Sequence, residues 1–356
     1  SQYGIVDTLS LNGAYFAKYD ENGILKWQVK TPASTSYSSS TFYEAIENSE
    51  GEVYISGIIG PLFVDNEGDT IKMTQYPDLT ATLIKINANG KLLWFRKVRN
   101  QNDAWSLGLD QNEYVFFIVN NGSVYDYLTW HLNDNQPEII DLPVYPVEAE
   151  FCLFKLDPQG NEIWHLPIAN YINNKVDFLR VYTDSLNNIY LAGQMDSKVR
   201  VFNPGSMTTY NEECASPCDG DRFFYYKLDE DGNYIWSMRA VNTIFSVEPS
   251  DIVVDKAGYS YITGEMHGSM IMENSDNSTY TIVSGGKIFV IKINPDGMTQ
   301  WIKSNTSGYY GGADKLDLVD DTLFVNCYTT AHSDLTINTS FMNNDGTSIN
   351  LTIFEQ

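Results

Sequence analysis

The chain has 356 residues, of which 43% are hydrophobic and 19% are charged, a balance typical of a folded soluble protein. Its formal net charge is -24, which argues against nucleic acid and anionic membrane as partners, because phosphate binding requires clustered Lys and Arg. No apolar run approaches the ~18 residues of a membrane-spanning helix, so no direct membrane insertion is expected.

A ten-residue unit occurs five times along the chain, with no residue gained or lost inside it. The copies are KYDENGILKW from Lys18, KINANGKLLW from Lys85, KLDPQGNEIW from Lys155, KLDEDGNYIW from Lys227 and KINPDGMTQW from Lys292. Each copy has a glycine three residues after an Asp or Asn, and a tryptophan four residues after the glycine. The glycines are Gly23, Gly90, Gly160, Gly232 and Gly297, and the tryptophans are Trp27, Trp94, Trp164, Trp236 and Trp301.

Each ten-residue unit is predicted to contain the turn of a β-hairpin. The residues before it are rich in β-formers, as in AYFAKYD and FFYYKLD, and an Asp or Asn ends this strand. The Asp or Asn side chain caps the turn, and the glycine takes a backbone position with positive φ. The second strand carries the tryptophan as a buried aromatic residue. These glycines and tryptophans are therefore interpreted as structural.

A second strand–turn–strand element follows each hairpin. EGEVYISG contains Tyr54, DSLNNIYLAG contains Tyr190 and DKAGYSYITG contains Tyr261, while two degraded copies contain Phe116 and Phe324. One repeat is therefore predicted to have four antiparallel strands, and the spacings between successive repeat tryptophans are 67, 70, 72 and 65 residues. Four strands at so long a period favour the blades of a β-propeller over a solenoid.

The expected architecture is all-β: a single β-propeller domain over residues 1–356, built from five repeats of about 68 residues. SQYGIVDTLSLNG looks like the tail of a truncated repeat, and SINLTIFEQ looks like the strand before a sixth ten-residue unit. Pairing the two ends would close five blades, and six blades with two incomplete ones is the alternative. The chain begins with Ser1 rather than Met, and we expect it to be part of a longer chain. Val119 replaces a repeat glycine, so an irregular blade is expected in the second repeat.

The repeats resemble the SBBP-type β-propeller repeats common in secreted and surface proteins of Bacteroidetes-like bacteria. The resemblance rests on GYYGGADKLDLVD from Gly308, DIVVDKAGYSYITG from Asp251 and the ten-residue units, and it covers nearly the whole chain. It implies a propeller that is extracellular or on the cell surface of a Gram-negative bacterium, in association with the outer membrane. It implies little about function, because propellers host many functions.

Long connections separate the second hairpin of each repeat from the next repeat lysine. From the aromatic residue to that lysine the distances are 31, 39, 37 and 31 residues. Loops on a rigid scaffold commonly carry binding, so any functional surface is expected on this face. The insert at residues 121–150 is the richest in aromatics, and Tyr125, Tyr127, Trp130 and Tyr145 are candidate binding residues. The alternative is that they pack the insert onto its own blade.

Other residues that could carry chemistry are interpreted as structural. Cys214 and Cys218, in ECASPC, are expected to form a short surface disulfide, since no second close cysteine pair completes a metal site. Cys152 and Cys327 lie in strand-like runs and are expected to be buried thiols. The repeat lysines are expected to lie along aromatic residues and pair with carboxylates. No cofactor is expected; DEDG and NPDG faintly resemble calcium loops, but turn chemistry accounts for them.

Catalytic motifs are absent from the sequence. The histidines are scattered, and there is no HExxH, no G-x-S-x-G and no P-loop. A pair of carboxylates for glycoside hydrolysis forms in space rather than in sequence and stays open. The expected function is that of a non-catalytic, protein-binding scaffold whose partner is another surface or outer-membrane protein. The alternatives are a carbohydrate-binding, lectin-like propeller and a propeller glycosidase or lyase.

Overall fold

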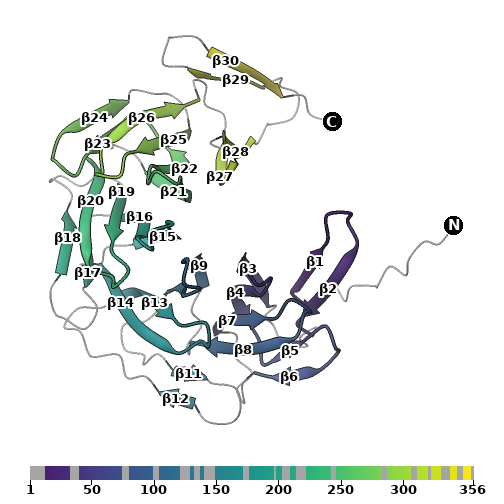
Figure 1. Ribbon diagram of the computed structural model, residues 1–356. Helices are drawn as coiled ribbons and strands as arrows, with labels where there is room; N and C mark the ends of the chain where they lie inside the picture. The colour runs from purple at the N-terminus through teal and green to yellow at the C-terminus, as the bar shows by residue number, and fades with distance from the viewer. Residues whose placement is uncertain are drawn as a thin grey trace. The chain divides into compact units, whose positions relative to one another are not determined.

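The computed structural model is all-β (Figure 1). It describes residues 13–32, 40–73, 80–98, 104–120, 129–131, 137–139, 149–170, 176–195, 198–202, 209–213, 222–241, 246–282, 287–305, 311–319, 322–329, 337–342 and 348–353. The chain falls into two compact units, one made of residues 1–107, 119–144 and 156–161, the other of residues 108–118, 145–155 and 162–356. In the described ranges there is no helix of the length and apolarity that crossing a membrane would require.

The thirty strands of the described residues recur in five sets of six. The first set is β1 (Tyr15–Tyr19), β2 (Leu25–Lys30), β3 (Thr41–Glu47), β4 (Val53–Ile59), β5 (Leu62–Val64) and β6 (Thr70–Lys72). The second is β7 (Thr80–Ile86), β8 (Leu92–Lys97), β9 (Ala104–Leu109), β10 (Val115–Asn120), β11 (Thr129–His131) and β12 (Pro137–Ile139). The third is β13 (Ala149–Leu156), β14 (Glu162–Asn170), β15 (Val176–Thr183), β16 (Ile189–Met195), β17 (Lys198–Phe202) and β18 (Thr209–Glu213).

The last two sets follow the same order. The fourth is β19 (Arg222–Leu228), β20 (Tyr234–Val241), β21 (Val247–Val254), β22 (Ser260–Met266), β23 (Met270–Glu273) and β24 (Thr279–Ile282). The fifth is β25 (Ile288–Ile293), β26 (Thr299–Ser304), β27 (Gly311–Val319), β28 (Thr322–Thr329), β29 (Ile337–Met342) and β30 (Ser348–Ile353). Each repeat is therefore three hairpins rather than the two predicted, because the long connection folds into a hairpin of its own.

Two six-stranded sheets show how the hairpins combine. Their strand orders are β9-β10-β13-β14-β17-β18 and β15-β16-β19-β20-β23-β24. Each sheet takes the second hairpin of one repeat, followed by the first and third hairpins of the next repeat. Val119 lies buried within β10 of the first of these sheets. Without the repeat glycine, β10 still takes its place between β9 and β13.

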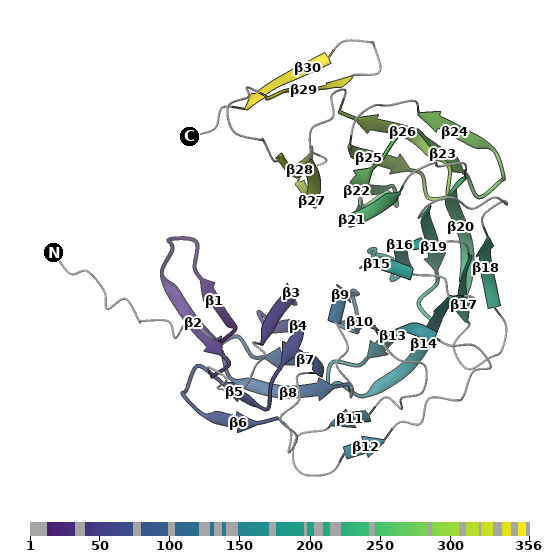
Figure 2. The ribbon, with the colours of Figure 1, turned by 180° about the vertical axis from the view of Figure 1, so that it is seen from behind.

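The remaining sheets contain parts of the same arrangement. Their orders are β3-β4-β7-β8, β21-β22-β25-β26, β1-β2-β5-β6 and β27-β28, with β11-β12 and β29-β30 as separate hairpins. β11 contacts β8 and β29 contacts β26, as β17 contacts β14 in the complete sheet. Both ribbon views show β5 and β6 beside β2, and β23 and β24 beside β20 (Figures 1 and 2). Within SINLTIFEQ, Ser348–Ile353 form the second strand of a third hairpin, and not the strand before a sixth ten-residue unit.

The turn of the ten-residue unit follows from its Asp and Gly. In the first copy, Asp20 Oδ1 accepts hydrogen bonds from the backbone amides of Asn22 at 2.9 Å and Ile24 at 2.8 Å. The five repeat glycines have φ between 75° and 86°, a region that other L-residues seldom adopt. Pairing shifts by one residue just after Lys18, so the turn is followed by a β-bulge, as in three-residue hairpin loops.

Each compact unit has its own hydrophobic core. In the first unit, Trp27, Val29, Ile55 and Phe63 belong to one buried cluster. In the second unit the larger cluster includes Tyr190, Trp236, Ile262, Phe289 and Ile291. The alternation of Trp27 and Val29 along β2 is the pattern expected of a strand that buries one face. The repeat tryptophans therefore belong to the packing that holds the sheets together.

Candidate functional site

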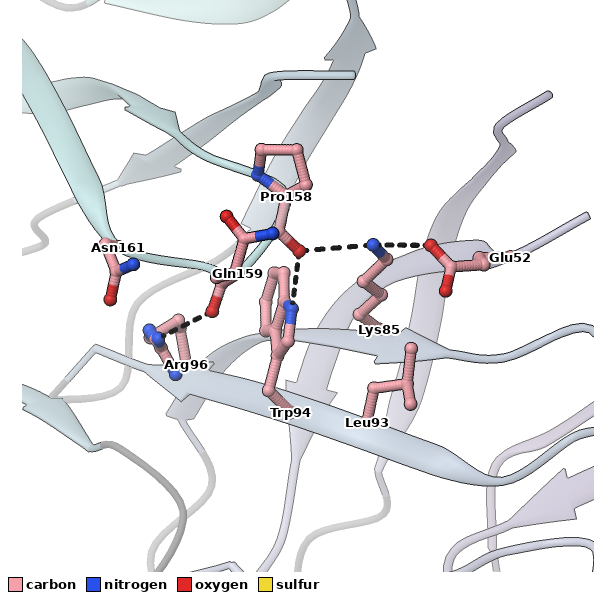
Figure 3. Close-up of a pocket in the computed structure, with 8 residues that line it drawn as sticks. All are labelled: Glu52, Lys85, Leu93, Trp94, Arg96, Pro158, Gln159 and Asn161. Atoms are coloured by element: carbon pink, nitrogen blue, oxygen red, sulfur yellow. Dashed lines mark hydrogen bonds and ion pairs between the residues drawn. The ribbon is translucent and has the colours of Figure 1, made fainter. Parts of the chain in front are cut away.

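A hollow of about 490 Å³ in the first compact unit is the strongest candidate for a site in the described residues (Figure 3). It combines a cation, an anion, an indole and backbone carbonyls from two successive ten-residue units. The lining residues are Glu52, Lys85, Leu93, Trp94, Arg96, Pro158, Gln159 and Asn161.

The carbonyl of Pro158 is the centre of the hollow. It accepts a hydrogen bond from Trp94 Nε1 at 3.0 Å and a second from Lys85 Nζ at 3.1 Å, as Figure 3 shows. Pro158 is the fourth residue of its ten-residue unit, directly after the capping Asp157, so the turn geometry aims this carbonyl outward. The preceding repeat supplies both donors. The two repeats are therefore joined at one oxygen atom.

Lys85 is held as an ammonium ion. Its Nζ lies 2.5 Å from Glu52 Oε2 and 5.0 Å from the centre of the Tyr54 ring. Burial lowers the pKa of Lys85, but hydrogen bonds and charges from Glu52 and Tyr54 outweigh burial, so the pKa lies above its usual value. A lysine in this state is neither a base nor a nucleophile at neutral pH. Its role here is that of a cationic hydrogen-bond donor.

Arg96 also forms hydrogen bonds with the turn of the next repeat. Its side chain is 3% exposed, and Nε donates to the carbonyl of Gly160 at 2.6 Å. The other nitrogens donate to the carbonyls of Phe95 and Gln159, and the guanidinium lies 5.2 Å from the Trp94 ring centre. The cation thus binds the protein's own backbone, which leaves little of it to recognise a phosphate or carboxylate.

The same junction recurs along the chain. Trp27 Nε1 donates to the carbonyl of Ala88 at 3.0 Å, and Trp236 Nε1 donates to that of Pro295 at 2.9 Å. The lysines share the pattern: Lys155 Nζ lies 2.7 Å from the carbonyl of Glu230, and Lys227 Nζ lies 3.5 Å from that of Pro295. Every one of these carbonyls belongs to the fourth residue of the next ten-residue unit. The prediction that the repeat lysines lie along aromatic rings is confirmed. The sequence analysis did not predict that three of these lysines also donate a hydrogen bond to a backbone carbonyl of the next repeat.

Three of the repeat glycines, Gly90, Gly160 and Gly297, pack against the tryptophan of the preceding repeat. A Cβ at Gly90 would come within 2.8 Å of Trp27, and a Cβ at Gly160 would come within 3.0 Å of the Trp94 ring. The same substitution at Gly297 would come within 2.9 Å of Trp236. Positive φ and the neighbouring indole therefore both require glycine at this position.

The repeat tryptophans differ in how completely they are covered. Trp27, Trp94 and Trp236 are at most 7% exposed, whereas Trp164 and Trp301 are partly exposed. Trp164 Nε1 is buried without a hydrogen-bond partner among the described residues, although Lys155 of the same repeat donates to the carbonyl of Glu230. A sugar-binding platform needs an open ring face, and the three buried indoles offer none.

The capping residues of the two calcium-like sequences are engaged within their turns. Asp229 Oδ1 accepts from the backbone amides of Asp231 at 3.0 Å and Asn233 at 2.8 Å, and Oδ2 accepts from Asn233 Nδ2. Asn294 Oδ1 accepts in the same way from the amides of Asp296 and Met298. These contacts are those of a side-chain-capped turn and account for the residues at both positions.

The predicted insert residues are only partly described. Trp130 lies in β11, opposite Glu138 of β12. Tyr125, Tyr127 and Tyr145 lie outside the described residues, and so do Cys214 and Cys218. Of the other two cysteines, Cys152 is buried as predicted, whereas Cys327 is exposed. The prediction for Cys327 is wrong because β28 ends its sheet, with only β27 beside it among the described strands.

The third hairpins were missed, although their signal is present in the sequence. Asp65 and Gly68 repeat the turn chemistry of the ten-residue unit: Asp65 Oδ1 accepts from the amides of Glu67 and Asp69. Gly68 has φ of 85°. The sequence VDNEGDTIK therefore encodes a hairpin inside a connection that the sequence analysis predicts to be a loop. Of the described third hairpins, β5-β6, β17-β18 and β23-β24 extend an existing sheet, whereas β11-β12 and β29-β30 are sheets of their own.

Lys97 is a buried cation that no sequence pattern indicates. Its side chain is 1% exposed, and Nζ donates to the carbonyls of Ile59 at 2.8 Å and Gly60 at 3.0 Å. Burial lowers the pKa of Lys97 to about 7. The amine holds the end of β4 against β8 and is closed off from solvent.

No protein-family model matches the chain, and no curated protein matches it significantly. Among solved structures, the chain is similar to a protein of unknown function from Bacteroides caccae. That similarity has 9% identity and a TM-score of 0.37, and covers 79% of this chain and 86% of the other. It is also similar to the extracellular domain of a protein provisionally described as a hybrid two-component system from B. thetaiotaomicron. There the identity is 10% and the TM-score 0.20, with 96% of this chain and 52% of the other covered.

Proposed function

We propose that this chain is a non-catalytic, secreted or cell-surface β-propeller that binds another protein and serves as a scaffold. The observation that carries the proposal is that repeat lysines and tryptophans form hydrogen bonds within the protein. The pairs Lys85–Trp94 and Lys227–Trp236, together with Trp27 and Lys155, donate to carbonyls of the next repeat instead of standing free to bind a ligand. Function is then left to the parts that differ between repeats, which are the inserts.

The propeller itself is part of this proposal. In the complete sheets, the second hairpin of one repeat precedes the first and third hairpins of the next. The β27-β28 sheet is a second hairpin alone, and the β1-β2-β5-β6 sheet is a first and third hairpin alone. Together they supply one further set of six strands. Five blades of six strands account for all of the described strands, whereas six blades would leave two of them incomplete.

The insert at residues 121–150 is the best candidate for the binding surface. It has the longest connection of the four measured between repeats and contains four aromatic residues, the type that most often anchors protein interfaces. Its hairpin, β11 and β12, lies against β8, which gives the segment a fixed base. Location outside the cell follows from the resemblance of the repeats to those of secreted and surface proteins.

The test is cross-linking of the full chain in the native organism, with the cross-linked peptides identified by mass spectrometry. We expect cross-links from residues 121–150 to one other surface protein. They should be lost in a variant with Tyr125→Ser, Tyr127→Ser and Trp130→Ser, which keeps the hairpin length. A matched control with Tyr19→Ser and Tyr43→Ser alters two exposed aromatics elsewhere, 56% and 49% exposed, and should keep them.

Two results would overturn the proposal. Cross-links unchanged by the triple substitution would remove the insert from the binding surface. Turnover of a glycan by the purified protein, abolished by replacing a single carboxylate, would make the protein an enzyme.

A further inference from the structure

The third hairpin of the first repeat holds the turn of the next ten-residue unit. Asn66 directly follows Asp65, the residue that caps the turn between β5 and β6. The backbone amide of Asn66 donates to the carbonyl of Gly90 at 3.0 Å, and Asn66 Nδ2 donates to the carbonyl of Asn89 at 3.1 Å. These carbonyls belong to the sixth and fifth residues of the next ten-residue unit. Because β5 also pairs with β2, this hairpin is part of the fold.

The third hairpin of the fourth repeat makes the same contacts. The backbone amide of Ser275, in the turn between β23 and β24, donates to the carbonyl of Gly297 at 3.1 Å. Ser275 Oγ donates to the carbonyl of Asp296 at 2.5 Å. The acceptors are again the sixth and fifth residues of the next unit, and β23 pairs with β20. The turns at residues 203–208 and 343–347, in the third and fifth repeats, lie outside the described residues.

In the second repeat an arginine side chain makes these contacts in place of a hairpin turn. Arg96 Nε donates to the carbonyl of Gly160 at 2.6 Å, and Arg96 Nη2 donates to the carbonyl of Gln159 at 3.3 Å, the contact drawn in Figure 3. Gly160 and Gln159 are the sixth and fifth residues of their ten-residue unit. The third hairpin of this repeat, β11 and β12, forms a two-stranded sheet of its own among the described strands. The junction is therefore complete without it.

The space beside the turn glycine identifies the position that the arginine fills. A Cβ at Gly90 would come within 2.6 Å of Asn66, and the corresponding distance to Ser275 in the fourth repeat is 2.9 Å. A Cβ at Gly160 would instead come within 2.9 Å of Arg96 Nη2. The guanidinium thus lies where the hairpin residue lies in the other two junctions.

Arg96 occupies a position that other repeats give to an apolar core residue. It comes two residues after the repeat tryptophan, where Val29, Leu166 and Met238 are at most 1% exposed. Arg96 is itself only 3% exposed, and a buried guanidinium costs free energy unless its N–H groups are satisfied. Its partners here are the carbonyls that a hairpin turn holds elsewhere. The exceptional arginine and the separate hairpin occur in the same repeat.

We infer that Arg96 replaces the turn of a third hairpin at this junction, so that the β11–β12 hairpin is not needed for the fold and its sequence is free to serve binding. The inference rests on the function proposed above and adds Arg96 to it as a positioning residue. The third hairpins of the first and fourth repeats must keep a turn that reaches the next unit. The second repeat is released from this requirement, which gives a physical reason why its insert is the longest and the richest in aromatics.

The first test replaces one hairpin at a time in the full chain by Gly and Ser residues. Residues 129–139 span β11 and β12, and residues 62–72, a range of equal length, span β5 and β6. Urea unfolding is followed by circular dichroism. We expect the midpoint to stay within about 0.2 M when residues 129–139 are replaced, and to fall by at least about 0.5 M when residues 62–72 are replaced. Equal falls would overturn the inference, because both hairpins would then be structural.

The second test asks whether an arginine can do the work of the turn in another repeat. In the unaltered chain Asn66 already holds the two carbonyls, so Val29→Arg should lower the midpoint. In the chain with residues 62–72 replaced, Val29→Arg should instead recover about half of the lost midpoint or more. The control Val29→Lys brings a cation without the planar fork of two donors and should recover less. A lower midpoint with Val29→Arg in both chains would overturn the inference.

A further comparison serves if the chain with residues 62–72 replaced does not fold. Arg96→Met is measured in the unaltered chain and in the chain with residues 129–139 replaced. Since the hairpin takes no part in the junction, we expect the two falls in midpoint to agree within about 0.2 M. Unequal falls would show that the hairpin and Arg96 hold the junction together, which contradicts the inference.

The unfolding measurements involve no partner, so this inference and the proposed function can fail separately. Cross-links to another surface protein that disappear when residues 129–139 are replaced, with the midpoint unchanged, support both. Cross-links that persist with the midpoint unchanged would overturn the binding role of the hairpin and leave the replacement of the turn by Arg96 standing.

Discussion

Gly160 lies directly on the ring of Trp94, the tryptophan of the preceding repeat: a Cβ at Gly160 would come within 3.0 Å of the indole. The same contact recurs at Gly90 and Gly297, and it gives a physical reason for the constant length of the ten-residue unit in these copies. The Asp places the turn, the turn aims a carbonyl and a glycine at the preceding repeat, and the tryptophan and lysine of that repeat are spaced to meet them. One inserted residue would break the hairpin and the junction together.

Gly160→Ala is expected to destabilise the protein more than Gly68→Ala does. Both glycines have positive φ, of 79° and 85°, so both substitutions carry the same backbone strain. Only Gly160 has an indole within reach of the new methyl group, whereas Gly68 has nothing within 4 Å. We expect the difference in unfolding free energy from urea denaturation to be about 1–3 kcal/mol, as for overpacking. Equal losses would show that the indole contact imposes no steric constraint.

Replacing a repeat tryptophan by phenylalanine separates the hydrogen bond from the packing. Trp27→Phe removes the donor at 3.0 Å from the Ala88 carbonyl, whereas Trp164→Phe removes an Nε1 that has no partner. Because only Trp27→Phe loses a hydrogen bond, we expect it to cost about 0.5–1.5 kcal/mol more than Trp164→Phe. Thermal or urea unfolding of the two variants measures the difference. A larger loss for Trp164→Phe would contradict the role given to the hydrogen bond.

The Glu52–Lys85 ion pair is expected to matter more than the exposed Glu67–Lys91 pair. The side chains of Lys85 and Glu52 are 5% and 18% exposed, against 50% and 54% for Lys91 and Glu67. Glu52→Gln leaves a largely buried ammonium without its carboxylate, at a cost of roughly 2 kcal/mol. Because the folded pKa of Lys85 is raised, the pair's contribution is complete at pH 7 and is lost only as pH rises through that pKa. Unfolding at pH 7 should show no measurable change for Glu67→Gln, which is the control.

The all-β class, the repeat and its turn could be predicted because their determinants are local. Asp20 and Gly23 are three residues apart, and the strand pattern around them is read directly from the sequence. The third hairpins could not be placed by the same reasoning. β5 pairs with β2, more than thirty residues earlier, and its own sequence shows only a turn signal at Asp65 and Gly68. The sequence pattern predicts such a turn, but it does not indicate which strand of the sheet the resulting hairpin pairs with.

The junction itself was hidden for a similar reason. The sequence indicated that the lysines and tryptophans were structural, but the atom that both reach in the second repeat is a backbone carbonyl, that of Pro158. Carbonyl oxygens are present at every residue, so composition cannot single one out. Its direction is determined only once the turn is formed and the next repeat is in place.

Lys97 should make the protein more stable as pH rises above neutrality. Its pKa is lowered to about 7 in the folded chain because burial disfavours the ammonium, whereas the unfolded chain keeps the ordinary value of 10.5. Below pH 7 the amine is charged in both states and the burial penalty is complete. Between pH 7 and 10.5 the unfolded state binds more protons, so unfolding free energy increases with pH. From pH 7 to 8.5 the gain should be on the order of 1–2 kcal/mol.

The neutral amine still has two N–H groups for the carbonyls of Ile59 and Gly60, which lie at 2.8 and 3.0 Å. Deprotonation therefore removes the buried charge without removing these hydrogen bonds. Lys97→Met lacks the titrating group and is the matched variant, and urea denaturation of both proteins at pH 7 and pH 8.5 gives the comparison. The natural protein should gain stability relative to Lys97→Met over this interval. Parallel behaviour of the two would mean that Lys97 stays charged in the folded state, with its two carbonyls compensating for burial.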